Sequence, residues 1–273
     1  MIQVEERYIS LLTDFGFKRI FGTAINKDLL ICFLNSLFDG KQVVKDVSYL
    51  NPEHVGDVYT DRKAIFDVYC EGENGEKFIV EMQNAYQTYF KDRSLFYSTF
   101  PIREQAALLN FDMNEEAFEK EKIRHSVQLC DTATHKVFYD KLEFIYVEIA
   151  KFNKSLEELE TLYDKWLYAL KNLYKLTQRP KELCDKVFDR LFEEAEIAKF
   201  TPQELREYEA SKIAYRDIKN SVDTAKREGI AEGMEKKSHE IAKKMLTKGM
   251  DEATVMEITG LSAELIQQLK AEM

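Results

Sequence analysis

The sequence contains few residues that break helices or cross-link the chain. Only 4 prolines and 10 glycines occur among 273 residues, so we expect abundant helix, especially in the second half. The four cysteines are far apart and include no Cys-x-x-Cys pair: Cys32, Cys70, Cys130 and Cys184. This spacing argues against a zinc site or a disulfide framework. It favours buried free thiols in a reducing cytoplasm.

The sequence also lacks long apolar runs and an excess of positive charge. No window approaches the roughly 20 apolar residues that span a bilayer, and the polar residues 1–7 carry no apolar signal region. We therefore expect a soluble cytoplasmic protein with no membrane partner. The chain has 39 Lys and Arg against 49 Asp and Glu, a net charge of −10. This balance counts against a protein that simply coats nucleic acid, although a basic cleft can lie on an acidic body.

The hydrophobic pattern predicts an α/β fold. Residues 9–38 have helical periodicity with a break at Gly22, whereas residues 43–83 and 124–150 are typical of strands. Nearly everything from residue 155 onward predicts helix. We expect a mixed sheet flanked by helices over residues 1–152, a helical extension packed on it over 153–202, and a long charged helix with a small terminal helical hairpin over 203–273.

Acidic side chains interrupt a predicted β-hairpin that is otherwise apolar. Two predicted strands are joined by Asn74-Gly75, the strongest short signal for a hairpin. Antiparallel pairing outward from this turn places Asp67 close to opposite Glu81 and Gln83. Glu81 and Gln83 are two residues apart, so they share one face of the sheet. Carboxylates placed in this way can bind Mg²⁺, which prefers hard oxygen ligands and keeps several waters.

Physical reasoning alone leaves two interpretations of this hairpin open. Acidic residues near strand ends are common, and Asp67 taken by itself is typical of a solvated edge residue. The metal-site interpretation depends on the joint pattern, in which an Asp interrupts one apolar strand and a Glu-x-Gln ends the next. Gln83 could orient a water or bind phosphate, but it cannot serve as a cation or as a strong general base.

Several blocks of the sequence, in their order, resemble the PD-(D/E)XK nuclease family transposases, which are related to the Rpn recombination-promoting nucleases. The similarity extends over nearly the whole chain. The blocks that carry it include Thr13-Asp14-Phe15-Gly16-Phe17-Lys18-Arg19-Ile20-Phe21-Gly22, Asp61-Arg62-Lys63-Ala64-Ile65-Phe66-Asp67-Val68, Val80-Glu81-Met82-Gln83, Phe90-Lys91-Asp92-Arg93-Ser94-Leu95-Phe96-Tyr97 and Ile258-Thr259-Gly260-Leu261-Ser262.

The resemblance implies a restriction-endonuclease-like fold and a DNA endonuclease that uses Mg²⁺ or Mn²⁺ in transposition, recombination or defence. It implies that Asp67 and Glu81 hold the metal and that Gln83 replaces the catalytic Lys of the motif. Asp14 would be an additional acidic ligand or a group that supports the ligands. The residues implied to face phosphate or DNA are Lys18, Arg93 and Tyr97; for the last two, a surface ion pair and a core aromatic are equal alternatives.

One departure from the family pattern bears on activity. The helix expected from about Tyr89 toward Gln105 runs almost directly into Leu108, so a stretch long enough for a core strand is missing. Either residues 108–113 substitute for that strand, or the sheet is one strand short. The alternative function is therefore a catalytically inactive nuclease-fold protein that binds DNA or a partner protein.

The C-terminal segment predicts a long charged helix followed by two short helices. Gly249 and Gly260 punctuate these helices, and Asp251 and Ser262 are suited to cap their N-termini. A helix-turn-helix that contacts DNA is one interpretation. Because Lys270 is the only basic residue of the last helix, we favour a helical cap or a dimer contact. The long charged helix makes a homodimer plausible.

Overall fold

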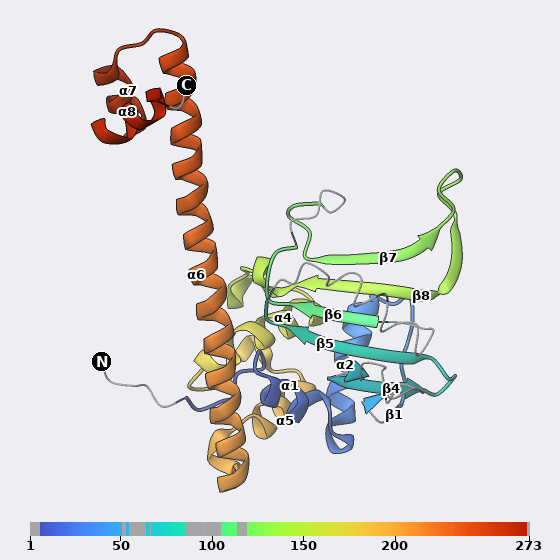
Figure 1. Cartoon of the computed structure of the whole chain (residues 1–273). Helices are drawn as coiled ribbons and strands as arrows, with labels where there is room; N and C mark the ends of the chain where they lie inside the picture. The colour runs from blue at the N-terminus through green and yellow to red at the C-terminus, as the bar shows by residue number, and fades with distance from the viewer. Residues whose placement is uncertain are drawn as a thin grey trace. The chain divides into compact units, whose positions relative to one another are not determined.

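The computed structural model describes residues 6–50, 53–54, 64–65, 67–85, 95, 105–113 and 119–271 (Figure 1). The chain divides into two compact units, Met1–Ile218 and Lys219–Met273, and the boundary falls inside helix α6 (Pro202–Thr247). The finer division of the first unit at residues 152 and 202 stays a prediction.

The first unit is an α/β fold built on a mixed sheet. Among the described residues, six strands form a sheet in the order β1-β4-β5-β6-β8-β7, and two short strands pair separately. The hairpin turn at Gly75 has φ +81°, as expected for the predicted Asn-Gly turn. Strands β5, β6 and β8 are parallel to one another, and the other pairs are antiparallel. The strands are β1 (Val47–Tyr49), β2 (Glu53–His54), β3 (Ala64–Ile65), β4 (Val68–Gly72), β5 (Lys77–Gln83), β6 (Gln105–Leu109), β7 (Arg124–Cys130) and β8 (Val137–Glu148).

The prediction that a core strand is missing after Gln105 is wrong. Residues Gln105–Leu109 form β6, which lies in the interior of the sheet between β5 and β8. The alternative that residues 108–113 supply the strand is right only in part, because the strand begins at Gln105 and ends at Leu109. The segment reads Gln-Ala-Ala-Leu-Leu and has no β-branched or aromatic residue, so pairing with two neighbours overrides a weak local preference. Of the helix expected before it, the structure describes Leu95, which is helical.

Helices cover one face of this sheet and bury an aromatic core. The predicted helical region 9–38 is divided near Gly22 into two α-helices with a short 3₁₀ turn between them. Trp166 lies against Phe21, Phe33 and Phe188 with ring centroids 5.0–5.7 Å apart, and all four side chains are fully buried. The helices of this unit, apart from α6, are α1 (Asp14–Phe21), η1 (Ala24–Asn26), α2 (Lys27–Phe38), η2 (Ile149–Lys151), η3 (Leu156–Glu158), α4 (Leu162–Asn172), η4 (Leu173–Lys175), η5 (Lys181–Leu183), α5 (Lys186–Glu194) and η6 (Ile197–Lys199).

The second unit consists of the remainder of α6 with α7 (Glu252–Thr259) and α8 (Ala263–Ala271). Its small core contains Ala242, Val255, Ile266 and Leu269. The predicted N-caps are present: Thr254 N donates to Asp251 Oδ1 at 3.0 Å, and Leu265 N donates to Ser262 Oγ at 3.4 Å. The terminal helices are therefore closed by local capping around a minimal apolar centre.

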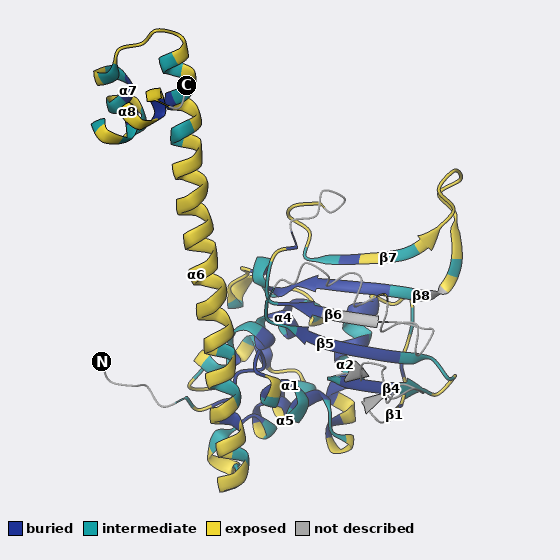
Figure 2. Cartoon of the chain, in the orientation of Figure 1, coloured by how far each residue is buried: buried dark blue, intermediate teal, exposed yellow. Residues whose placement is uncertain are grey.

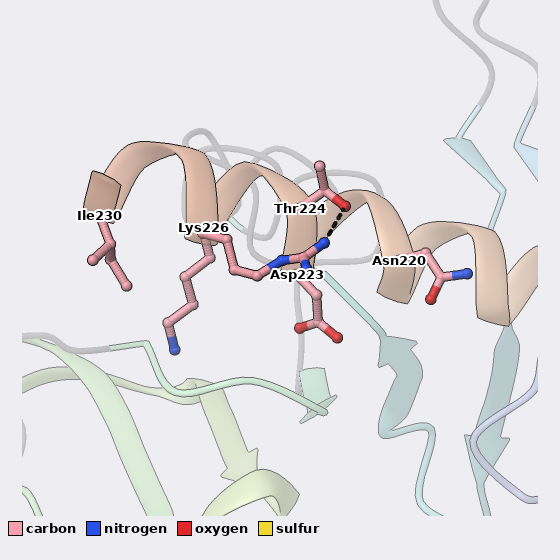
Figure 3. A pocket seen from close by; sticks show the side chains of 6 residues that line it. Asn220, Asp223, Thr224, Lys226 and Ile230 are labelled. Carbon is pink, nitrogen blue, oxygen red and sulfur yellow. Dashed lines mark hydrogen bonds between the residues drawn. The ribbon is translucent and has the colours of Figure 1, made fainter. Parts of the chain in front are cut away.

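Residues 219–237 of α6 are exposed along their whole length (Figure 2). Figure 3 shows six of these side chains, between Asn220 and Ile230, projecting from the helix, with Arg227 donating to Thr224 Oγ1 at 3.3 Å. A charged and exposed stretch of this kind is typical of either a solvated face or a coiled-coil face.

Among the described residues, no single helix is long and apolar enough to cross a membrane, and only α1 together with Ala24–Phe38, a pair bent by 64°, meets the length and composition criterion.

Candidate active site

The β4–β5 hairpin brings the predicted catalytic residues to one end of the sheet. Val68 pairs with Val80, so Asp67, which directly precedes β4, lies across from Glu81. The Asp67 Oδ2 atom accepts a hydrogen bond of 2.8 Å from Met82 N. The carboxylate thus continues the pairing of the two strands by one hydrogen bond beyond the start of β4.

Glu81 and Gln83 lie on the sheet face opposite the helices. Val80 and Met82 belong to the main core beneath α1 and α2, and the alternation of a strand directs Glu81 and Gln83 to the other side. Gln83 Nε2 donates to Glu81 Oε2 at 3.2 Å, which places the two side chains together. Glu81 is only 3% exposed, so its carboxylate occupies a largely desolvated position at the end of β5.

Helix α1 supplies a cation to the same end of the sheet. Lys18 Nζ lies 3.6 Å from Asp67 Oδ1 and 2.7 Å from Asp14 Oδ1, and its side chain is 40% exposed. Partial burial pulls the pKa of Lys18 down, but the two carboxylates outweigh this effect and raise the pKa above its usual value. Lys18 therefore carries a positive charge beside Asp67 at any physiological pH.

Burial is the main influence on the charge of Asp67. It raises the pKa of this carboxyl, whereas the Met82 amide and Lys18 act in the opposite direction without cancelling the effect. The folded chain thus makes ionised Asp67 less favourable than ionised Asp in water. A cation bound near Oδ1 would recover that free energy.

The structure connects Asp14 to this site through Lys18 rather than directly. The Asp14 carboxylate is 65% exposed and forms its ion pair with Lys18 one helical turn away. Across the described part of the chain, no group of three or more His, Cys, Asp or Glu side chains is arranged to hold a metal ion. Arg93 and Tyr97 lie outside the described residues.

Three polar residues that the sequence analysis did not identify border the site. Asn110, one residue past β6, donates from its backbone N to Gln83 O at 2.9 Å. Its side-chain Nδ2 donates to Tyr215 Oη on α6 at 3.1 Å and to Asn84 Oδ1 at 3.5 Å. Asn84 Nδ2 donates to Leu12 O at 3.0 Å. The position of each Asn, directly after an apolar strand, was a usable signal in the sequence; nothing local pointed to Tyr215.

A second polar cluster lies on the same sheet face, two strands from Gln83. Glu148, at the end of β8, is aligned with Leu109 of β6, and Leu109 is aligned with Gln83. The fully buried Glu148 carboxylate accepts from Met113 N at 2.6 Å and pairs with His125 at 3.0 Å and Lys151 at 2.8 Å. His125 lies in β7 and is buried in this cluster.

A mixed sheet with helices on one face, and an Asp opposite a Glu-x-Gln at the end of a central hairpin, define a restriction-endonuclease-like α/β fold followed by a helical region. Comparison with known families agrees with this assignment. The chain belongs to the PD-(D/E)XK nuclease family transposases, because the model of that family matches residues 11–225. The C-terminal helix-turn-helix domain of the Rpn/YhgA-like nuclease family matches residues 235–271. Comparisons with curated proteins and with solved structures give no match.

These matches confirm the family resemblance that the sequence blocks indicated. They also bear on the terminal helical hairpin. From the sequence, a helical cap or dimer contact was favoured there over a helix-turn-helix that contacts DNA. The matched domain is described as a helix-turn-helix, so the interpretation that ranked second gains support. The chain thus joins a nuclease-family domain associated with transposition to a terminal domain of a DNA-binding class.

Proposed function

We propose that the chain is a DNA endonuclease that uses Mg²⁺ or Mn²⁺ to hydrolyse phosphodiester bonds in transposition, recombination or defence. The observation that carries the proposal is the placement of Asp67 across from Glu81, with Gln83 beside Glu81, at the end of the β4–β5 hairpin. Membership of the PD-(D/E)XK nuclease family transposases supports the same reaction.

The donor set fits a small hard cation. Asp67 and Glu81 offer carboxylate oxygens, and Gln83 offers an amide oxygen; Mg²⁺ commonly binds proteins through one or two carboxylates and keeps several waters. The raised pKa of Asp67 fits a position at which a cation offsets the cost of burying charge. A bound ion would supply Lewis-acid stabilisation of the charge that develops on the phosphate.

The remaining residues bind and orient the substrate in this proposal. Lys18, 3.6 Å from Asp67 and 40% exposed, supplies the positive charge that Gln83 does not provide, and it binds a phosphate oxygen. Asp14 holds the Lys18 side chain in place through their 2.7 Å ion pair and so supports the metal ligands indirectly. Gln83 orients the attacking water. Arg93 and Tyr97 complete the phosphate contacts.

The terminal unit binds DNA in the proposed function. Exposed Gln267, Gln268 and Lys270 lie on α8, and Lys244 and Lys248 lie near the end of α6. Glutamine side chains can read base edges in the major groove, and lysines contact phosphates. The exposed stretch of α6 would in addition pair two copies of the chain as a homodimer.

A plasmid-nicking assay in Mg²⁺ tests the catalytic proposal. Asp67→Ala and Glu81→Ala should each slow nicking on the order of a hundredfold to a thousandfold, as loss of one electrostatic group at a reaction centre commonly does. Glu71→Ala is the matched control, because Glu71 is an acidic residue of the same hairpin that pairs with Lys77 at 2.9 Å, away from Asp67. This control should nick at the wild-type rate.

Equal nicking by all four proteins would reveal a contaminating nuclease and end the proposal. Binding of DNA by the wild-type protein without any nicking would instead indicate the catalytically inactive alternative, a DNA-binding module on a nuclease fold.

A further inference from the structure

The first turns of α6 are joined by hydrogen bonds to the first turn of α1 and to the segment before it. Ser10 N donates to Tyr208 Oη at 2.9 Å, and Phe15 N donates to Ser211 Oγ at 3.0 Å. Phe15 lies between Asp14 and Lys18, the ion pair through which α1 approaches Asp67. This part of α6 therefore holds the α1 side of the candidate active site.

One turn farther along, α6 reaches the opposite side of the site. The Tyr215 ring packs against the main core, and its hydroxyl accepts from Asn110 Nδ2 at 3.1 Å. Asn110 N donates to Gln83 O at 2.9 Å, and the Asn110 side chain also reaches Asn84, which follows Gln83. A continuous chain of hydrogen bonds thus runs from α6 to the end of β5.

We propose that Tyr215 is a positioning residue: through Asn110 it fixes the end of β5, and with it Glu81 and Gln83, relative to Asp67 and Lys18. This inference rests on the proposed nuclease function. None of the predicted site residues lies on α6. In this inference α6 positions the site, because the same helix contacts both α1 and the segment after β6 that bonds to β5. Reacting groups must be held to within a fraction of an ångström, so a small displacement of β5 would slow the chemical step.

The variant Tyr215→Phe tests this role directly, since it keeps the packed ring and removes only the hydroxyl. In the nicking assay we expect kcat to fall roughly tenfold while KM changes by less than about twofold, the signature of lost positioning rather than lost DNA binding. Asn110→Ala should have the same effect, and the double variant should be no worse than Asn110→Ala alone.

Hydrogen exchange of the full-length protein gives a second readout that does not depend on catalysis. The Asn110 amide bonds to Gln83 O, so exchange in peptides covering residues 105–113 should become faster in Tyr215→Phe. Asn35→Ala is the control, because it removes a half-buried side chain of α2 that donates to Val44 O at 2.8 Å and accepts from Val44 N at 2.7 Å, outside the candidate active site. It should lower stability at least as much, yet leave both kcat and exchange of residues 105–113 unchanged.

Three results would overturn the inference. The first is a rise in KM at constant kcat, which would make Tyr215 a DNA contact. The second is unchanged exchange and unchanged kcat in Tyr215→Phe. The third is an equal loss of kcat in Asn35→Ala, which would reduce the effect to general destabilisation. If the wild-type protein cuts no DNA, the proposed function fails, and the exchange experiment still decides whether Tyr215 fixes the end of β5.

Discussion

The two faces of the six-stranded sheet differ in the side chains that they bury. On the helix-covered face, Val80 and Val147 join an apolar core. The residues next to them in sequence, Glu81 and Glu148, are also buried but point to the other face. At these two positions, a shift of one residue along the strand separates aliphatic from ionisable side chains, and the ionisable ones share their face with apolar residues such as Ile79, Leu109 and Phe144. Burial of apolar side chains on the helix-covered face stabilises the fold. Burial of charge on the other face costs part of that stabilisation.

The polar face itself holds two kinds of acidic residue. Glu148 pairs with His125 and Lys151, which are contributed by neighbouring protein segments. Asp67 has a raised pKa despite the nearby Lys18, so burial dominates its environment. The first carboxylate is stabilised within the fold, whereas in the proposed function the second binds a metal ion. This difference separates a structural cluster from a candidate active site on the same face.

The largest effect on stability should come from Glu148→Ala. The substitution removes the acceptor for Met113 N and the common partner of His125 and Lys151, all within 3.0 Å. Breaking a buried ion pair from one side typically costs about 3 to 5 kcal/mol. Urea unfolding at pH 7 measures the change, and we expect the free energy of unfolding to fall by that amount.

Glu148→Gln serves as the control for this substitution. The amide oxygen can still accept from Met113 N, so the loss should be clearly smaller than for alanine. If Glu148→Ala lowers the free energy of unfolding by less than about 1 kcal/mol, the ion pairs of Glu148 contribute no more than an exposed ion pair does. The cluster would then not be what stabilises this face of the sheet.

Val147→Ala should have an intermediate effect. Val147 is fully buried in the main core, so the change removes apolar contacts on the helix-covered face and leaves the polar face intact. Deletion of buried methyl groups from a side chain of this size costs roughly 1 to 2.5 kcal/mol. The measurement is again urea unfolding, now combined with the nicking assay. The nicking rate should fall only by the fraction of protein that is unfolded. A larger fall in kcat would show that the helix-covered face also affects catalysis, and would contradict the separation of the two faces.

Local signals in the sequence predicted the β4–β5 hairpin and the placement of its acidic residues. The Asn74-Gly75 turn fixes the register over a short distance, so Asp67 and Glu81 follow from counting outward. The strand β6 was missed for the opposite reason, because its Gln-Ala-Ala-Leu-Leu segment has little strand preference of its own. Its conformation depends on pairing with β5 and β8, and β8 is more than 25 residues farther along the chain.

Contacts between distant segments were also beyond the reach of the sequence. Asn110 and Tyr215 are 105 residues apart, and Met113 and Glu148 are 35 apart. No periodicity or spacing pairs such residues, since only the folded topology brings them together. The terminal domain presents a related case, because counting basic residues on α8 alone overlooked Lys244 of α6 and Lys248, which directly follows that helix.

The smallest expected effect on stability, and the one that tests the polar face most closely, is that of Asp67→Asn in the absence of metal. A raised carboxyl pKa means that the unfolded chain ionises first as the pH rises above the ordinary value of 3.8. Ionisation of Asp67 therefore lowers the free energy of unfolding of the wild type. This loss is absent at low pH, grows as the pH rises from 3.8 to the raised pKa, and stays constant above that pKa. The asparagine keeps an acceptor for Met82 N and carries no charge, so the variant should be slightly more stable than the wild type at pH 7 and equal to it at low pH. The difference should be smaller than the cost of Val147→Ala.

Addition of Mg²⁺ should reverse the order of these two proteins. Binding to the folded state alone stabilises the wild type in proportion to the logarithm of the metal concentration, and Asp67→Asn loses that gain together with a ligand. The measurement is urea unfolding of both proteins at pH 7, with EDTA and then with increasing Mg²⁺. If Asp67→Asn is the less stable protein in EDTA, the carboxylate belongs with Glu148 as a structural group. If instead Mg²⁺ stabilises both proteins equally, the ion binds elsewhere, and the contrast between the two kinds of buried acid on this face is lost.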